Sequence, residues 1–246
     1  MKDNWTDEQF AADWDGQHIT GNPTRPFLLA LIVAILQSLA AERSTLSLLE
    51  IGSGSGLVTE RILDAMPSAT VDGVDFSEPM MALAAMRLAR HGTRFRQHRR
   101  ALVSFRTGTL VPGRFDAVLA LQVLHEVPSP AKRAVLASLR GSLADGGLLL
   151  YGERLRADYA GFAVPHAALW RALSGWTPET TQPAFADRVR EVMGKTDFTV
   201  GLADELAAFA EAGYRVEPLI VLGERCLLAA IPKYRRTVPA PVADKS

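Results

Sequence analysis

The stretch LLEIGSGSGLVTERIL, residues 48–63, decides the fold because it joins an apolar strand to a helix through three alternating glycines. The apolar letters before the first glycine predict a buried strand, and helical spacing resumes at Leu57. Gly52, Gly54 and Gly56 allow the backbone to lie against a ligand with no side chain between them. The stretch therefore predicts a ligand site where a strand of an α/β sheet turns into a helix.

The spacing of these glycines separates two classes of ligand. Dinucleotide-binding turns carry G-x-G-x-x-G, but Leu57 or Thr59 occupies the place of the third glycine here. Glu50 instead stands two residues before the first glycine and gives E-x-G-x-G-x-G. This pattern resembles motif I of the class I S-adenosylmethionine (SAM)-dependent methyltransferases. The resemblance implies that the glycine loop, with Ser53, passes under the methionine end of SAM and that Glu50 helps to hold the region of its ammonium group.

An acid also ends the next predicted strand, residues 70–74. Asp75 follows the glycine loop by roughly 20 residues, a position from which a carboxylate accepts both hydroxyls of a ribose. Phe76 beside it is placed to lie against an adenine ring. The next helix includes Met80, which we count among the cofactor contacts although its helical spacing also suits the core. These residues extend the predicted SAM site to the second strand.

With 246 residues, 48% of them hydrophobic, the chain is long enough to bury one sizeable core with a lid. Lysine plus arginine equals aspartate plus glutamate at 27 each, so no overall charge attracts nucleic acid or an anionic membrane. The longest apolar run, residues 27–36, is shorter than the about 20 residues that span a bilayer. The single cysteine, Cys226, lies in an apolar run, and no Cys/His cluster suggests a metal site. We therefore expect a cytoplasmic protein with no metal and no membrane partner.

The order of the predicted elements indicates an α/β fold. Apolar runs predict five further strands, at 94–98, 115–121, 148–153, 215–222 and 225–231. A helix from about Leu202 leads into the last two strands, which form a hairpin. This ending resembles the close of the seven-stranded methyltransferase fold. We expect a Rossmann-like, seven-stranded, mostly parallel sheet with an antiparallel terminal hairpin, an N-terminal helical arm and a helical lid insertion.

We divide the chain into an N-terminal arm and helix over residues 1–45, a SAM-binding domain over 46–232 and a flexible tail over 233–246. An insertion at about 154–200, rich in aromatic residues and prolines, does not belong to the minimal fold. It is placed to overhang the carboxyl ends of the strands, where open α/β sheets bind ligands. We interpret it as a helical lid over an aromatic substrate pocket, with a homodimer surface as the alternative.

The N-terminal arm is predicted to fold over the site. Trp14 and Arg25 are the residues that would close over the cofactor, and packing of the arm's tryptophans against the sheet is the alternative interpretation. The predicted substrate contacts in the arm, the strand ends and the lid are Trp14, His125, Tyr151, Tyr159, His166 and Trp170.

The string from Phe115 to Val127 resembles the motif after the fourth strand of small-molecule methyltransferases. The resemblance implies that Leu121 and Gln122 contact SAM through their backbone. His125 and Glu126 are the best placed acid/base candidates. An oxygen or nitrogen acceptor with a removable proton profits from a nearby base, for which His125, Glu153 or His166 could serve. The alternative is that His125 caps the next helix or lines the pocket. The predicted cofactor contacts are Arg25, Glu50, Gly52, Ser53, Gly54, Gly56, Asp75, Phe76, Met80, Leu121 and Gln122.

A run of arginines from Arg87 to Arg106 lies in a segment without acids. Such a run can meet an anionic substrate or RNA, or form a solvated face. The resembling family often has an aspartate after the third strand that contacts the adenine amino group. Arg100 stands there instead, which leaves adenine recognition to backbone groups or to Ser104.

The leading interpretation is SAM-dependent methyl transfer to a small molecule, in secondary or cofactor metabolism. Three alternatives stay open: non-methylating SAM chemistry similar to that of carboxy-SAM synthases, for which Arg25 is the residue to watch, a tRNA-directed protein that uses the arginine run, and a nicotinamide-dependent oxidoreductase. No N-P-P-Y-type motif follows the fourth strand, which disfavours the nucleic-acid branches. The sequence does not specify whether the acceptor atom is oxygen, nitrogen, sulfur or carbon.

Overall fold

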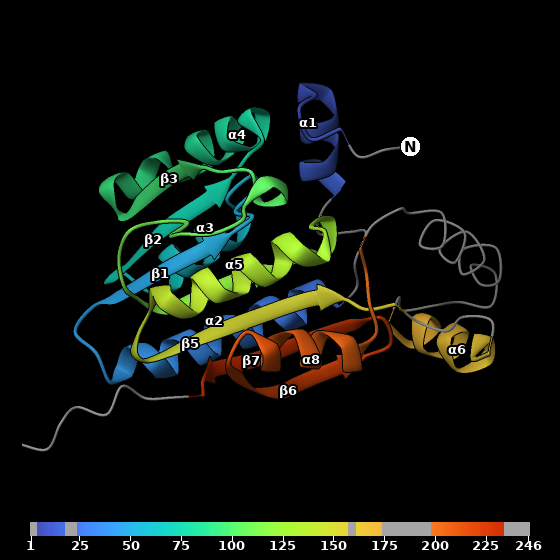
Figure 1. The fold of residues 1–246 in the computed structure, drawn as a ribbon. Coiled ribbons are helices and arrows are strands. Elements are labelled where there is room, and N and C mark those ends of the chain that lie inside the picture. Colours follow the sequence, from blue (N-terminus) through green and yellow to red (C-terminus); the bar gives the residue numbers. More distant parts are fainter. Residues whose placement is uncertain (1–3, 18–23, 157–160, 174–197, 234–246) are drawn as a thin grey trace, which may run out of the picture.

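The computed structural model of the chain describes residues 4–17, 24–156, 161–173 and 198–233. Its strands are β1 (Leu46–Ile51), β2 (Ala69–Asp75), β3 (Phe95–Arg99), β4 (Phe115–Leu121), β5 (Leu143–Arg154), β6 (Tyr214–Leu222) and β7 (Arg225–Pro232). They form one seven-stranded sheet in the order β3-β2-β1-β4-β5-β7-β6 (Figure 1). The first five strands pair in parallel, and β7 pairs antiparallel with both β5 and β6. The predicted sheet with its antiparallel terminal hairpin is confirmed.

Helices cover both faces of this sheet (Figure 1). They are α1 (Glu8–Gln17), α2 (Arg25–Ala41), α3 (Leu57–Ala65), α4 (Glu78–Leu88), α5 (Ser129–Ser142), α6 (Ala163–Leu173) and α8 (Leu202–Glu211), with short 3-10 turns η1 (Ala89–Arg94), η2 (Leu102–Ser104) and η3 (Leu124–Glu126). α2 and α3 pack on one face, and α5 and α8 pack on the other. Pro26, Pro79 and Pro130 lie in the first turns of α2, α4 and α5, where a missing backbone N–H leaves no helical hydrogen bond unmade.

The central strands are buried on both faces. In β1, Leu46 and Leu48 belong to the core under α2, whereas Leu49 and Ile51 belong to the core under α5. A strand covered on both sides reads as a continuous apolar run rather than an alternating one. The sequence of β1 therefore predicts a strand without predicting which face each side chain takes.

β5 begins earlier than predicted. Its ladder with β4 passes from Leu143, opposite Phe115, to Leu148, opposite Ala117. Residues 144–147 have no partner in that register, and Gly146 among them has a φ of +73°. The residues just before the predicted strand 148–153 therefore form an irregularity inside a longer strand.

The single cysteine lies in the hairpin at the end of the fold. Cys226 of β7 pairs with Glu153 of β5 and is fully buried. Burial raises the pKa of its thiol to about 12. The side chain therefore behaves as a small apolar group of the core.

The two predicted appendages are described in part. The arm contains α1, which lies beside α4 (Figure 1). The insertion contributes α6 and residues 198–200; Tyr159 lies outside the described residues, as does the side chain of Trp170 in α6. Within the described ranges, no helix combines the length and the apolar character needed to cross a bilayer.

Candidate active site

The three glycines between β1 and α3 all have left-handed backbone, with φ values of +68°, +52° and +77° for Gly52, Gly54 and Gly56. A Cβ on Gly52 would lie 2.5 Å from Val123 Cγ2, and one on Gly56 would lie 2.8 Å from Leu88 Cδ1. At Gly54, no atom of the described residues lies within 4 Å of an added Cβ. Gly52 and Gly56 thus allow close packing, whereas Gly54 leaves space for a ligand.

This difference predicts unequal effects of alanine substitutions. Any non-glycine residue in left-handed backbone costs about 1–2 kcal/mol. We expect Gly54→Ala to lower the free energy of unfolding by about this amount, and Gly56→Ala to lower it further because its Cβ also meets Leu88 and Ala84. Urea unfolding of both variants measures the difference. Equal losses would contradict the assignment of Gly54 to the open side of the loop.

A cavity of about 220 Å³ lies over the glycine loop at the carboxyl ends of β1, β2 and β4. All predicted cofactor contacts except Gly56 line it, and so does the predicted substrate contact Trp14. Further lining residues that were not among the predicted contacts include Trp5, Arg100 and Val123, and the acid/base candidate Glu126 also lines the cavity. Val123 packs against Gly52. The glycine at position 52 indicates that another residue approaches the backbone closely, but it does not identify that residue.

Two side chains of opposite charge, the buried Glu50 and the partly buried Arg25, line this cavity. Burial raises the pKa of Glu50 to about 7, against the hydrogen bond that its carboxylate accepts from the Thr59 hydroxyl. Burial and the nearby charge of Arg225 lower the pKa of Arg25 to about 10. Arg25 Nε is buried and has no hydrogen-bond partner among the described residues. A buried acid and a guanidinium whose Nε has no hydrogen-bond partner among the described residues suit, at one cavity, a ligand that carries both an ammonium and a carboxylate.

Asp75 connects the glycine loop to the end of β2. Its Oδ2 accepts a hydrogen bond from the Gly54 amide at 2.8 Å. Its Oδ1 accepts from the amides of Phe76 and Ser77 at 2.7 and 2.9 Å. These bonds hold the carboxylate in one orientation at the cavity wall, and its remaining lone pairs can accept from ligand hydroxyls.

Gln122 marks the point where β4 ends at the cavity. Gln122 has a φ of +54°, and no other non-glycine residue in the described part of the chain has a positive φ. Its amide donates to the Gly152 carbonyl of β5 at 2.6 Å, which holds the turn in place. Strained backbone of this kind costs about 1–3 kcal/mol and gathers at functional sites.

His125 and Glu153 form an ion pair beside the cavity. His125 Nδ1 lies 2.6 Å from Glu153 Oε1, and His125 Nε2 lies 3.3 Å from Glu126 Oε1. Burial lowers the pKa of His125, but the charge of Glu153 and hydrogen bonds to both glutamates outweigh it and raise the pKa to about 9. Burial raises the pKa of Glu153, but the charge of His125 outweighs it and lowers that pKa. The imidazole thus holds its proton at neutral pH, and a role as catalytic base stays a prediction.

This pair predicts a pH dependence of stability. Because the folded pKa of His125, about 9, lies above the ordinary value of 6.5, its stabilisation is complete below pH 6.5 and is lost as pH rises through 9. We expect a loss of up to about 3 kcal/mol over this window. The difference in unfolding free energy between wild type and His125→Gln should therefore shrink from pH 6 to pH 9.5 in urea titrations. A constant difference would contradict the ion pair.

The structure places the other predicted residues away from the main cavity. Glu153 lines a smaller void of about 30 Å³ that shares Arg25, Leu121 and Gln122 with the main cavity. Tyr151 is fully buried in the core, with its ring edge-on to Phe209 at 5.0 Å between centroids. His166 Nδ1 of α6 lies 3.9 Å from where a Cβ of Gly223, between β6 and β7, would be. These placements leave the substrate roles of Tyr151 and His166 as predictions.

Comparisons with known proteins relate part of the chain to methyltransferases. A family model described as a methyltransferase domain matches residues 49–149. An uncharacterized protein of Synechococcus sp. is 34% identical over 114 residues, which cover 45% of this chain and 27% of that protein. A ubiquinone biosynthesis O-methyltransferase of Dechloromonas aromatica is 35% identical over 94 residues, which cover 38% of this chain and 37% of the relative. The chain thus spans well under half the length of these curated relatives.

Solved structures give the same fold. The S-adenosylmethionine-dependent methyltransferase SibL in its apo form superposes with a TM-score of 0.62 and 17% identity, covering 95% of this chain and 63% of SibL. The DhpI-SAH complex superposes with a TM-score of 0.57 and 18% identity, covering 93% of this chain and 94% of DhpI. At these identities the likeness establishes the fold. Together with the domain match, it confirms the resemblance predicted from the glycine loop.

Proposed function

We propose that this chain, which carries a methyltransferase domain of the class I SAM-dependent family, transfers a methyl group from SAM to a small-molecule acceptor. The observation that carries the proposal is the arrangement of Arg25, Glu50, Gly54 and Asp75 on one cavity. SAM fits these groups. Glu50 suits its ammonium, the unsatisfied Nε of Arg25 suits its carboxylate, and Asp75 suits its ribose hydroxyls.

Bound SAM supplies a methyl group that is attached to a positively charged sulfur. The sulfur becomes neutral when the methyl group is transferred. The protein must therefore align the acceptor and exclude water rather than stabilise a leaving anion. Trp5 and Trp14 supply apolar surface at the cavity that serves this exclusion. Gln122, held at the end of β4, fixes the wall next to the smaller void.

We propose a hydroxyl group as the acceptor. The match to O-methyltransferase relatives supports this choice, and Glu126 gives it a chemical basis. Glu126 lines the cavity and lies next to the His125–Glu153 pair. Its carboxylate can take the proton that the hydroxyl loses, while the His125 imidazolium holds the carboxylate in position. His125 and Glu153 would then affect proton removal from the acceptor indirectly, by positioning the Glu126 carboxylate.

Calorimetry and a labelling assay test the proposal. The protein is titrated with S-adenosylhomocysteine and, separately, with NAD, and we expect binding of the first and none of the second. Protein incubated with methyl-labelled SAM and a panel of small hydroxylated compounds should release labelled products that are stable to mild base, as ethers are. Tight NAD binding without S-adenosylhomocysteine binding would overturn the cofactor. Label that stays on SAM-derived compounds would favour non-methylating chemistry.

The arginine run makes contacts within the chain. Arg90 Nη2 lies 2.7 Å from Asp64 Oδ2, and Arg96 Nη2 lies 2.7 Å from Asp72 Oδ2. These pairs reduce the net positive charge of that face, which favours a small-molecule substrate over tRNA in our proposal. A homodimer, a cytoplasmic location and a role in secondary or cofactor metabolism stay predictions.

A further inference from the structure

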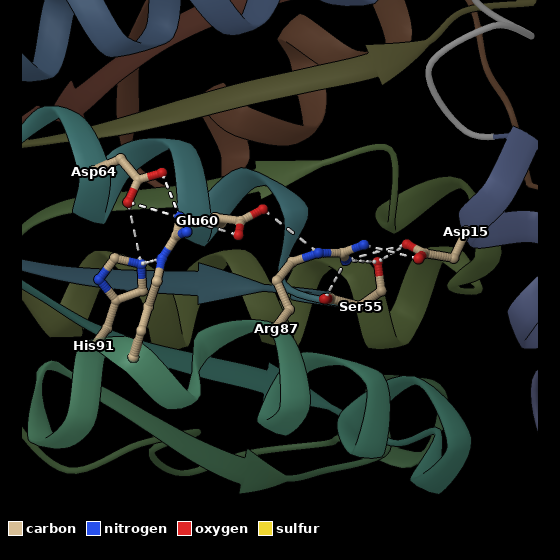
Figure 2. A network of polar contacts seen from close by, with 7 residues as sticks. Asp15, Ser55, Glu60, Asp64, Arg87 and His91 are labelled. Atoms are coloured by element: carbon tan, nitrogen blue, oxygen red, sulfur yellow. Dashed lines mark hydrogen bonds and ion pairs between the residues drawn. The ribbon is translucent and has the colours of Figure 1, made fainter.

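We propose that Arg87 is a positioning residue that fixes α1 to the glycine loop. The cavity wall formed by the arm and the loop under the ligand would then move together. The Arg87 cluster consists of Asp15 in α1, Ser55 in the glycine loop and Arg87 in α4 (Figure 2). The nature of the ligand rests on the proposed function. The mechanical coupling of α1 to the loop rests on contacts within the chain.

Figure 2 shows the guanidinium of Arg87 between the two elements. On one side, Arg87 Nη1 donates to the Ser55 carbonyl at 2.5 Å and to the Ser55 hydroxyl at 2.8 Å. On the other side, Nη1 and Nη2 donate to the two carboxylate oxygens of Asp15 at 3.1 and 2.8 Å. The Ser55 hydroxyl donates to Asp15 and closes the triangle. Arg87 Nε also lies 3.5 Å from Glu60 Oε2 of α3. All three nitrogens of the guanidinium thus have partners, an arrangement that lysine could not reproduce.

The cluster is shielded from solvent. The side chains of Arg87 and Asp15 are 21% and 18% exposed, and Ser55 is buried. A bidentate ion pair that is largely shielded from solvent holds its geometry better than the exposed ion pairs of a protein surface. Arg90, by comparison, is 58% exposed and pairs with Glu60 and Asp64 of α3. Arg90 thus provides a matched arginine on the same side of the fold, whose polar contacts among the described residues are with α3 and His91 rather than with α1.

A second contact fixes the start of the arm. The Ser77 hydroxyl donates to the Trp5 carbonyl and also accepts from the Met80 amide at the start of α4. The Ser77 amide in turn donates to Asp75. The segment from Trp5 to Asp15 is thus attached at one end to the start of α4 and at the other to Arg87 and the glycine loop. Both α4 and the glycine loop carry predicted cofactor contacts.

α1 depends on such attachments because it is short. A helix of ten residues is marginal on its own in water. Trp5 packs edge-on against Phe10 and Trp14, and both tryptophans line the cavity. Loss of the Arg87 cluster should release this wall and, through Ser55, loosen the glycine loop.

The test compares Arg87→Gln, Arg87→Lys and Asp15→Asn with Arg90→Gln. Hydrogen exchange of the α1 amides in the ligand-free protein should become faster in the first three variants and stay at the wild-type rate in Arg90→Gln. The dissociation constant of S-adenosylhomocysteine should rise about ten-fold in Arg87→Gln and Asp15→Asn, and less than two-fold in Arg90→Gln. The double variant Asp15→Asn/Arg87→Gln should bind no more weakly than Arg87→Gln, because both changes remove one unit.

Two outcomes would overturn the proposal. One is wild-type exchange of α1 in both Arg87→Gln and Asp15→Asn. Asp15 lies in α1, outside the sheet, so Asp15→Asn decides the matter should Arg87→Gln fold poorly. The other is faster exchange with unchanged S-adenosylhomocysteine affinity, which would separate α1 from the ligand site. A wild-type protein that does not bind S-adenosylhomocysteine would refute the proposed function, and the exchange rates would still decide whether Arg87 positions α1.

Discussion

Asp75→Asn is expected to weaken the binding of S-adenosylhomocysteine by about two orders of magnitude. Two charge-assisted hydrogen bonds to ribose hydroxyls would be replaced by weaker neutral ones, at about 1.5–3 kcal/mol for each bond to a charged group. The new amide nitrogen would also face a backbone N–H, because the amides of Gly54, Phe76 and Ser77 all donate to this carboxylate. Calorimetry at pH 7.5 measures the loss.

Asp116→Asn is the matched control for this substitution. Asp116 also accepts a backbone hydrogen bond, from the Ser47 amide at 2.8 Å, and pairs with Arg43. It stands near the start of β4, at the opposite end of the strand from Gln122 and the cavity. We expect its affinity to stay at the wild-type value. An Asp75→Asn variant that binds within three-fold of wild type would refute the ribose assignment.

Glu153→Gln is expected to lower the free energy of unfolding by about 3–5 kcal/mol, the usual cost of breaking a buried ion pair from one side. Glu153 is buried, and its Oε2 accepts from the amides of Leu124 and His125 at 3.0 and 3.2 Å. Its Oε1 accepts from the Arg154 amide at 2.7 Å and pairs with His125 Nδ1. A glutamine offers one acceptor oxygen to these donors and leaves the His125 charge uncompensated on its buried side.

In thermal unfolding this loss corresponds to a fall of roughly 10 °C for a chain of this size. Glu126→Gln removes the other carboxylate beside the same imidazole, and its side chain is 40% exposed. We expect that variant to lose less than about 1 kcal/mol, as exposed pairs do. Similar losses in both variants would show that the buried side of His125 is not the side that stabilises the fold.

The sequence predicts the sheet and the glycine loop because both are local patterns. Glu50, the three glycines and Asp75 stand at the ends of apolar runs, and the carboxyl ends of parallel strands meet at one edge of a sheet. Their positions on the cavity therefore follow from strand boundaries alone. The sequence does not reveal that Gly52 and Gly56 pack against Val123 and Leu88, since these neighbours come from distant segments of the chain.

Other parts of the site depend on contacts that no local pattern contains. Tyr151 lies in a strand covered on both faces, so its letters do not reveal that it points into the core under α5. The direction of the His125 ring in η3 is set by Glu153 of β5, which is distant in the sequence. Asp15 and Arg87 are 72 residues apart, and the sequence shows them only as an acid in the arm and one member of a basic run.

The buried thiol of the terminal hairpin makes the natural chain ready for site-specific labelling. Maleimides react with thiolates, and a pKa of about 12 leaves almost no thiolate on Cys226 at neutral pH. The sequence contains no second cysteine. A cysteine introduced at the exposed position Glu8 of α1 would therefore be the one reactive thiol, and a spin label or fluorophore attached there would report movements of α1 with no native residue removed from the core.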